Sequence, residues 1–364
     1  MNRCFLGNLL LAFGILILFG CGKNNQLSKT EGIPTLVIPH SEASAKPAWL
    51  TDYSDETRAI PLESTPKSLI SYIGDVAFGE TYIYVLNLGA DPSIMQFDWD
   101  GRYIRRIGIN GQGPGEFQVP TSIAYDGRRK RLIVCAPFDH KTLIFEEDGT
   151  LVEEYIDKTR MLSATFVTSD HYFFWESQYG EPHENGFLVN NRLHVLGSEF
   201  DTLASPAHNI HLIRNLGLVY RQQNFVFQVN DTSYFFLPTL LPETYRRDTL
   251  YTVSNNFELV PEVNFRFRES VSEATFPPEF SMGDVQVTPT LYQVQYRYKG
   301  ERYLYIHEKS NRKSSVVKGG FQDPKFPETG MPFSKSNGTS YFVIEQRDAV
   351  GQEDNPMLLW VRWK

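Results

Sequence analysis

Residues 73–108 read IGDVAFGETYIYVLNLGADPSIMQFDWDGRYIRRIG, and residues 123–155 read IAYDGRRKRLIVCAPFDHKTLIFEEDGTLVEEY. Each stretch contains four short runs rich in β-branched and aromatic residues, separated by turn residues. The two stretches align with an offset of 48 residues, which brings Phe97 onto Phe145 and Asp100-Gly101 onto Asp148-Gly149. Asp-Gly is a strong signal for a two-residue hairpin turn in which both residues have positive φ. Four antiparallel strands repeated every ~40–50 residues predict the blades of a β-propeller.

More degenerate copies follow along the chain. We assign blade three to 172–175 and 193–196, blade four to 225–229, 233–237, 249–253 and 259 onward, blade five to 293–296, 303–306 and 314–317, and blade six to 341–344 and 357–363. The sequence therefore predicts an all-β fold, a six-bladed β-propeller of four-stranded antiparallel blades over residues 57–364. An extra strand at 59–62 is expected to pair with 358–363 and close the ring, which removes open sheet edges.

Composition narrows the range of partners. The net charge of -8 and the pI of about 5.6 argue against a nucleic-acid binder, which would normally carry a basic patch or stripe. Three cysteines are too few for a disulfide scaffold. Cys135 lies in the apolar run 132–135 and is expected to be a buried, inert thiol.

The N-terminus is typical of an exported lipoprotein. Arg3 precedes an apolar run from Leu9 to Phe19, which is too short to span a membrane and predicts a signal peptide over residues 1–20. The run ends in Leu18-Phe19-Gly20-Cys21, which resembles a bacterial lipobox, so Cys21 is the expected lipidation site. A lipid on Cys21 would anchor the chain to a membrane.

Residues 21–56 are predicted to form a lipidated, flexible tether, because they are polar and rich in Ser, Pro and charged residues. In Bacteroides-type lipoproteins an acidic run after the cysteine accompanies export to the outer face, and here the nearest charges are Lys23 and Lys29. We therefore expect the chain to be anchored in the outer membrane of the cell envelope and to face the periplasm, and we leave a surface-exposed orientation open. We also expect a monomer.

The segment 108–120, GINGQGPGEFQVP, resembles the blade crossover of NHL-type propellers. Its glycines permit positive φ, and Phe117 is expected to wedge between neighbouring blades. With the lipobox, the strand 248–251 and the closing residues 355–359, this segment resembles the six-bladed β-propeller lipoproteins of Bacteroides-type bacteria, with NHL- or TolB-like blades. The resemblance implies the fold, but little about activity.

A candidate binding rim follows from strand parity. The turn between strands two and three of each blade lies on the same face as the crossover to the next blade. Polar and glycine residues expected on this face are Asp91, Gly113, Glu116, Asp139, His140, Glu176, His183, Arg246, Arg247, His307, Glu308, Glu345 and Arg347. The alternative interpretation is that these loops are polar only because water surrounds them.

Two functions remain open. The sequence favours a non-catalytic binding or scaffolding module that presents its loop face to an envelope protein, peptide or glycan, with no cofactor and no catalytic residues assigned. The alternative is a metal-dependent enzyme, lactonase- or lyase-like, with Ca or Zn held at the channel mouth by the rim acids and by His140, His183 and His307. Such a site needs ligands from at least three blades, and the metal remains unknown from sequence.

Overall fold

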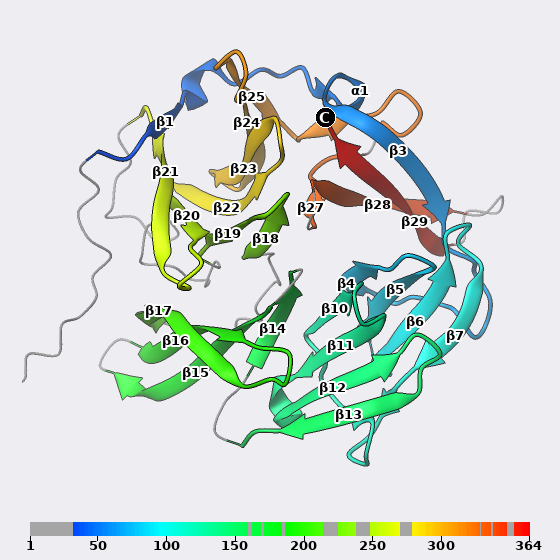
Figure 1. The fold of residues 1–364 in the computed structure, drawn as a ribbon. Coiled ribbons are helices and arrows are strands. Elements are labelled where there is room, and N and C mark those ends of the chain that lie inside the picture. The colour runs from blue at the N-terminus through cyan, green and yellow to red at the C-terminus, as the bar shows by residue number, and fades with distance from the viewer. Residues whose placement is uncertain are drawn as a thin grey trace, which may run out of the picture. The chain divides into compact units, whose positions relative to one another are not determined.

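The computed structural model describes residues 32–89, 91–158, 162–168, 171–183, 186–213, 225–237, 248–269, 279–327, 329–335, 338–347 and 353–364. Residues 32–364 form one compact unit. In this unit six blades of four antiparallel strands follow one another around a ring, with β4, β10, β14, β18, β22 and β27 nearest the ring axis (Figure 1). The predicted six-bladed propeller is confirmed.

The two clearest repeats form blades one and two. Blade one contains β4 (Ile73–Phe78), β5 (Tyr82–Asn87), β6 (Ser93–Asp98) and β7 (Tyr103–Ile107), and blade two contains β10 (Ser122–Asp126), β11 (Arg131–Ala136), β12 (Lys141–Glu146) and β13 (Leu151–Ile156). The crossover between them carries the short parallel pair β8 (Ile109–Asn110) and β9 (Glu116–Phe117), and η2 (Pro137–Asp139) joins β11 to β12.

The Asp-Gly turns differ from the predicted type. Gly101 has φ of +82° and Gly149 has φ of +86°, whereas the preceding aspartates do not have positive φ. The Gly101 N–H donates to Asp98 O and the Asp98 N–H donates to Arg102 O, both at 3.0 Å. This is a turn closed by a left-handed glycine, the longer hairpin connection with a bulge, so only the glycine of each pair needs positive φ.

Blades three to five follow the assigned strands and add others. Blade three has β14 (Leu162–Val167), β15 (Tyr172–His183), β16 (Gly186–Leu196) and β17 (Thr202–Ile213); blade four has β18 (Val226–Val229), β19 (Thr232–Phe236), β20 (Thr249–Val253) and β21 (Leu259–Phe267); blade five has β22 (Phe280–Val287), β23 (Leu291–Tyr298), β24 (Glu301–Glu308) and β25 (Ser314–Lys318). Sequence reasoning missed β14, β17 and β22 as strands, and the last omission changes the parity of blade five.

Blade six closes the ring by combining the two ends of the body. It contains β27 (Phe333–Ser334), β28 (Thr339–Arg347) and β29 (Glu353–Trp363), and its outermost strand is β3 (Ser54–Pro61). In the β29–β3 pairing, Leu358 lies opposite Ile60 and Met357 lies opposite Pro61. The predicted closure is confirmed.

The segment from Thr35 to Trp49, called the strap below, is paired with the body instead of forming a free tether. β1 (Thr35–Ile38) runs parallel to β21, η1 (His40–Glu42) follows, Ser44 bridges to Val317, and β2 (Ala48–Trp49) runs parallel to β26 (Phe321–Gln322) before the short helix α1 (Leu50–Tyr53). The outermost strands of blades four and five have free edges, and the strap pairs with them. The ordered body thus begins before the predicted boundary at residue 57, and residues 1–31 lie outside the described part of the chain.

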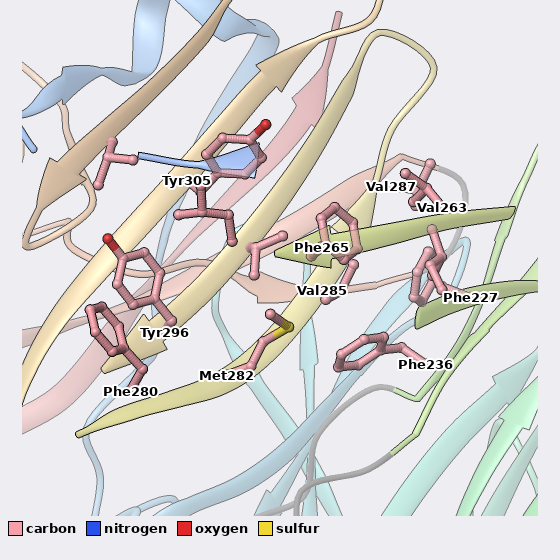
Figure 2. Close-up of a cluster of buried hydrophobic side chains, with 14 of the residues drawn as sticks. Phe227, Phe236, Val263, Phe265, Phe280, Met282, Val285, Val287, Tyr296 and Tyr305 are labelled. Atoms are coloured by element: carbon pink, nitrogen blue, oxygen red, sulfur yellow. The ribbon is translucent and has the colours of Figure 1, made fainter. Parts of the chain in front are cut away.

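The core consists of apolar clusters at the interfaces between blades. Figure 2 shows the one between blades four and five, where Phe227, Phe265, Met282 and Val285 meet. Phe117 is fully buried between blades one and two, which confirms its predicted wedge position. The Gly108 backbone, with φ of +66°, lies so close to Phe117 that a Cβ at position 108 would be 2.3 Å from the ring. Cys135 is also fully buried, and burial raises the pKa of its thiol.

His40 fastens the strap to blade five. Its Nδ1 lies 2.8 Å from the Tyr296 hydroxyl oxygen. Its ring also packs against three aromatic rings, with centroid separations of 5.1 Å to Phe280, 4.2 Å to Tyr298 and 4.7 Å to Tyr303. Burial lowers the pKa of His40 below its ordinary value of 6.5, although the nearby carboxylates of Glu269 and Glu279 oppose the shift. The aromatic cage therefore favours the neutral imidazole.

We expect the stability of the body to fall as the pH drops below about 6.5, because His40 then gains a proton more readily in the unfolded chain than in the cage. His40→Asn keeps a polar partner for Tyr296 but cannot titrate in this range, so the thermal midpoint of this variant should depend less on pH between about 7.5 and about 5. Burial also lowers the pKa of His307, so some dependence should remain. A slope equal to that of the wild type would contradict the assignment to His40.

Candidate functional site

The crossover face, defined by the crossovers between blades and the turns between second and third strands, carries most of the predicted rim. The residues placed there are Asp91 between β5 and β6, Gly113 and Glu116 in the first crossover, Asp139 and His140 between β11 and β12, His183 at the end of β15, and Glu345 and Arg347 near the end of β28. Arg246, Arg247 and Cys21 lie outside the described residues. These turns come from separate blades, as parity predicted.

Three predicted rim residues lie elsewhere, because Glu176 is buried inside β15 and the other two lie in blade five. His307 and Glu308 end β24, which is the third strand of blade five because β22 precedes the assigned strands. Their turn to β25 therefore lies on the face opposite the crossover face, and their placement on the rim was wrong. His307 Nδ1 lies 2.8 Å from Ser314 Oγ, and Glu308 accepts a hydrogen bond from Asn311 at 2.6 Å.

The first crossover is braced by its own charged groups. The Glu116 carboxylate accepts the Gly113 N–H at 2.8 Å, and Asp139 accepts the Gln118 N–H at 2.7 Å. Lys141 Nζ donates to the carbonyls of Gly113 at 2.9 Å and Glu116 at 3.3 Å. It also pairs with Glu154 at 3.1 Å, and both side chains are largely buried. Gly113, Glu116 and Asp139, which were predicted as binding-rim residues, thus take part in the hydrogen bonds that brace the crossover.

Other rim charges also have intramolecular partners. Asp91 pairs with Arg106 at 2.6 Å, and this hydrogen bond lowers the pKa of the exposed carboxyl. Glu176 lies within blade three, 6 % exposed, where its carboxylate is 2.6 Å from His194 Nε2. Asp91 and Glu176 therefore pair with residues of their own blades, as the charged residues of the first crossover bond to groups beside them.

The braced face also presents several apolar side chains to solvent. Among the described residues, six of the twelve most exposed large apolar side chains lie on the crossover face: Leu69, Tyr72, Ile109, Val119, Phe138 and Ile156. The other six are distributed over the strap and the outer strands of four blades. Phe138, at the tip of η2, is the most exposed of them at 60 %. Sequence reasoning missed this set because it searched the loops for charges only.

Three of these side chains belong to one structural unit, called the apolar loop cluster below: Val119, Phe138 and Ile156. Asp139 links the first two, since its Oδ2 accepts from Gln118 N and lies 3.5 Å from Val119 N. His140, two residues beyond Phe138, accepts the N–H of Asp157, the neighbour of Ile156. Hydrogen bonds thus hold the three backbone segments of the cluster together.

A polar cluster lies nearer the ring axis and ties four blades together. Asp75 on β4 pairs with Lys335, which follows β27, at 2.8 Å. The same carboxylate accepts the Ile123 N–H at 3.1 Å, and Ser122 Oγ accepts the Thr165 N–H at 3.2 Å. The N–H groups come from the innermost strands, whose axial edges have no strand partner. Side chains of neighbouring blades thus satisfy donors that would otherwise be unpaired.

The described residues contain no group of three His, Cys, Asp or Glu side chains arranged to hold a metal ion. Within the same residues, no helix is long and apolar enough to cross a membrane.

Comparisons with known proteins place the fold and the family. A family model described as a domain of unknown function (DUF4934) matches residues 35–361. The crystal structure of a candidate exported protein from Bacteroides fragilis is similar with a TM-score of 0.57 and 17 % identity, over 87 % of this chain and 99 % of that one. A member of the DUF4221 family from Bacteroides vulgatus gives a TM-score of 0.51 and 11 % identity, over 85 % and 97 % of the two chains. A search of curated proteins finds no match.

Proposed function

Since the chain belongs to the DUF4934 family, whose description assigns no function, we propose from the structure itself that it is a protein-binding module of the cell envelope. The observation that carries this proposal is the apolar loop cluster on the crossover face. Its occupant would be a protein that offers a complementary apolar surface. The signal-like residues 1–20, the lipobox ending at Cys21 and the structural similarity to a candidate exported protein support export and lipid anchoring.

Exposed apolar side chains favour a protein partner when they are held rigidly. Phe138 and Ile156 are each about three-fifths exposed, and burying them against a partner would contribute roughly 25 cal/mol per Å² of apolar area. The hydrogen bonds of Asp139 and His140 fix the backbone beneath these side chains before any partner arrives. Such preorganisation reduces the ordering cost of association. Aromatic side chains such as Phe138 are also enriched at protein–protein interfaces.

The charged residues of the rim are also consistent with a protein-binding module. Asp91, Glu116 and Asp139 are engaged with their own blades, so they brace the face more than they offer free ligands. No observation among the described residues supports the other hypothesis from sequence, a metal-dependent enzyme. We therefore propose the lipid-anchored monomer as a scaffold for an envelope protein, with no cofactor in that role.

The proposal predicts a specific contact at Phe138. A photoreactive benzoylphenylalanine at position 138 of the full-length chain, expressed in its own cells, should give one discrete crosslinked adduct. Val119→Asp together with Ile156→Asp should lower the yield of this adduct by at least about tenfold, because each charge removes an apolar contact worth ~1–2 kcal/mol. Thermal unfolding of the double variant checks that the exposed substitutions leave the fold intact.

The matched control places the same photoreactive residue at Val152, an exposed position on the outer strand β13 away from the crossover face. No discrete adduct is expected there. Equal crosslinking from position 152, or an adduct from position 138 that survives the two aspartates, would refute the crossover face as the binding surface.

A further inference from the structure

Blade three brings a serine, a histidine and a glutamate into one hydrogen-bonded line. Ser205 Oγ lies 3.0 Å from His194 Nδ1, and His194 Nε2 lies 2.6 Å from Glu176 Oε2. The three residues come from β17, β16 and β15, which are neighbouring strands of one sheet. Groups held on adjacent strands keep their relative positions better than groups on loops.

The exposure of the three residues suits nucleophilic catalysis, which needs an accessible nucleophile beside a buried base and a buried carboxylate. His194 is 3 % exposed and Glu176 is 6 % exposed, whereas Ser205 is exposed. The carboxylate can only accept, so Nε2 carries the proton of the neutral imidazole and Nδ1 is left to accept from the serine. A buried carboxylate fixes the tautomer and the orientation of the imidazole, while the serine itself lies at the surface.

An irregularity in the sheet explains how Ser205 reaches the histidine. Leu193 pairs with Ala207 and Val195 pairs with Ala204, so Ser205 and Pro206 together lie opposite His194. Such a bulge redirects side chains, and bulges are over-represented next to active sites. No local motif signals the arrangement, because the three residues are 18 and 11 positions apart.

We propose that Ser205 is a nucleophile activated by His194 and Glu176, and that it acts on carboxylic esters at the outer part of blade three. Ser205 Oγ would attack the carbonyl carbon and form the new C–O bond, while its proton passes to His194 Nδ1. The ester C–O bond then breaks, and the leaving alcohol takes that proton. Water adds to the acyl-serine through the same base and releases the carboxylic acid, which restores the free hydroxyl. This activity is separate from partner binding at the crossover face.

The test uses the full-length chain and a fluorophosphonate probe, which phosphonylates an activated serine with loss of fluoride. We expect covalent labelling at Ser205, located by mass analysis of the modified peptide, and hydrolysis of p-nitrophenyl acetate that Ser205→Ala removes. His194→Ala and Glu176→Gln should each slow the labelling at least about 100-fold, as in other triads.

Ser198→Ala is the matched control, because Ser198 is an exposed serine of the same blade whose hydroxyl faces Glu199 and not a histidine. Its labelling and hydrolysis rates should equal those of the wild type. Ser205→Ala removes one exposed hydroxyl and should fold normally, so its readout holds even where a histidine or glutamate variant unfolds. Absence of label on Ser205 in the wild type, or equal labelling in a folded His194→Ala chain, would overturn the proposal.

Discussion

Replacing Ile60 by aspartate is expected to lower the free energy of unfolding by at least about 4 kcal/mol. Ile60 is fully buried in β3, the only part of blade six that comes from the N-terminal side, and it lies opposite Leu358, which is also fully buried. Removing a large aliphatic side chain from such a position costs ~2–5 kcal/mol, and an unpaired buried carboxylate adds to that loss. Because β3 closes the ring, its loss exposes the edge of β29.

Chemical denaturation with an unfolding midpoint and slope measures this loss. Arg58→Ala is the matched control in the same strand. It removes only the exposed pair with Asp100, whose side chains are 43 % and 72 % exposed, and should cost less than about 1 kcal/mol. If Ile60→Asp cost no more than Arg58→Ala, the closing strand would not be needed for stability.

Where strands were recognised from their own residues, the sequence predicted the fold well. The Asp98–Arg102 and Glu146–Thr150 turns each contain an Asp-Gly pair, which marks a hairpin locally and lets two blades be aligned. β22 was missed because the pattern of 280–287, FSMGDVQV, is interrupted by glycine and aspartate. Since strand direction alternates, one missed strand moves every later turn of that blade to the other face. This error displaced His307 and Glu308.

The strap shows a second limit of local reasoning. Residues 35–49 contain too few apolar residues to form a core of their own, which predicted a free tether. In the fold, Ile38 is fully buried and Ala48 nearly so, because they add to cores that blades four to six have already formed. Composition indicates whether a segment can form a core of its own, but it does not indicate whether a free sheet edge elsewhere in the fold can pair with that segment.

The candidate sites were harder to predict because they depend on convergence between blades. Glu176 was singled out from its charge, yet its partners His194 and Ser205 become neighbours only through strand register. Val119, Phe138 and Ile156 look like ordinary loop residues until the crossover face brings them together. Polar residues in loops did not point to these groups, since several of them have partners nearby: Glu116 and Asp139 accept from backbone N–H groups, and Asp91 pairs with Arg106.

The axial pair Asp75–Lys335 also depends on residues from different blades, and removing one of its charges has the other large expected effect. Their side chains are 11 % and 16 % exposed, so each charge depends on its partner. We expect Asp75→Ala to lower the free energy of unfolding by about 3–5 kcal/mol, because it leaves the Lys335 ammonium buried without its carboxylate and removes the acceptor for the Ile123 N–H.

Lys335→Met should cost less than Asp75→Ala, because the carboxylate left behind still accepts from Val76 N at 2.9 Å and Ile123 N at 3.1 Å. Asp75→Ala combined with Lys335→Met should cost less than the sum of the two single changes, since the second removes the charge that the first leaves unpaired. Asp91→Ala, which breaks a pair whose side chains are 31 % and 60 % exposed, is the control and should lower the free energy of unfolding far less than Asp75→Ala. Additive single and double values in denaturation would show that the two axial charges do not depend on each other.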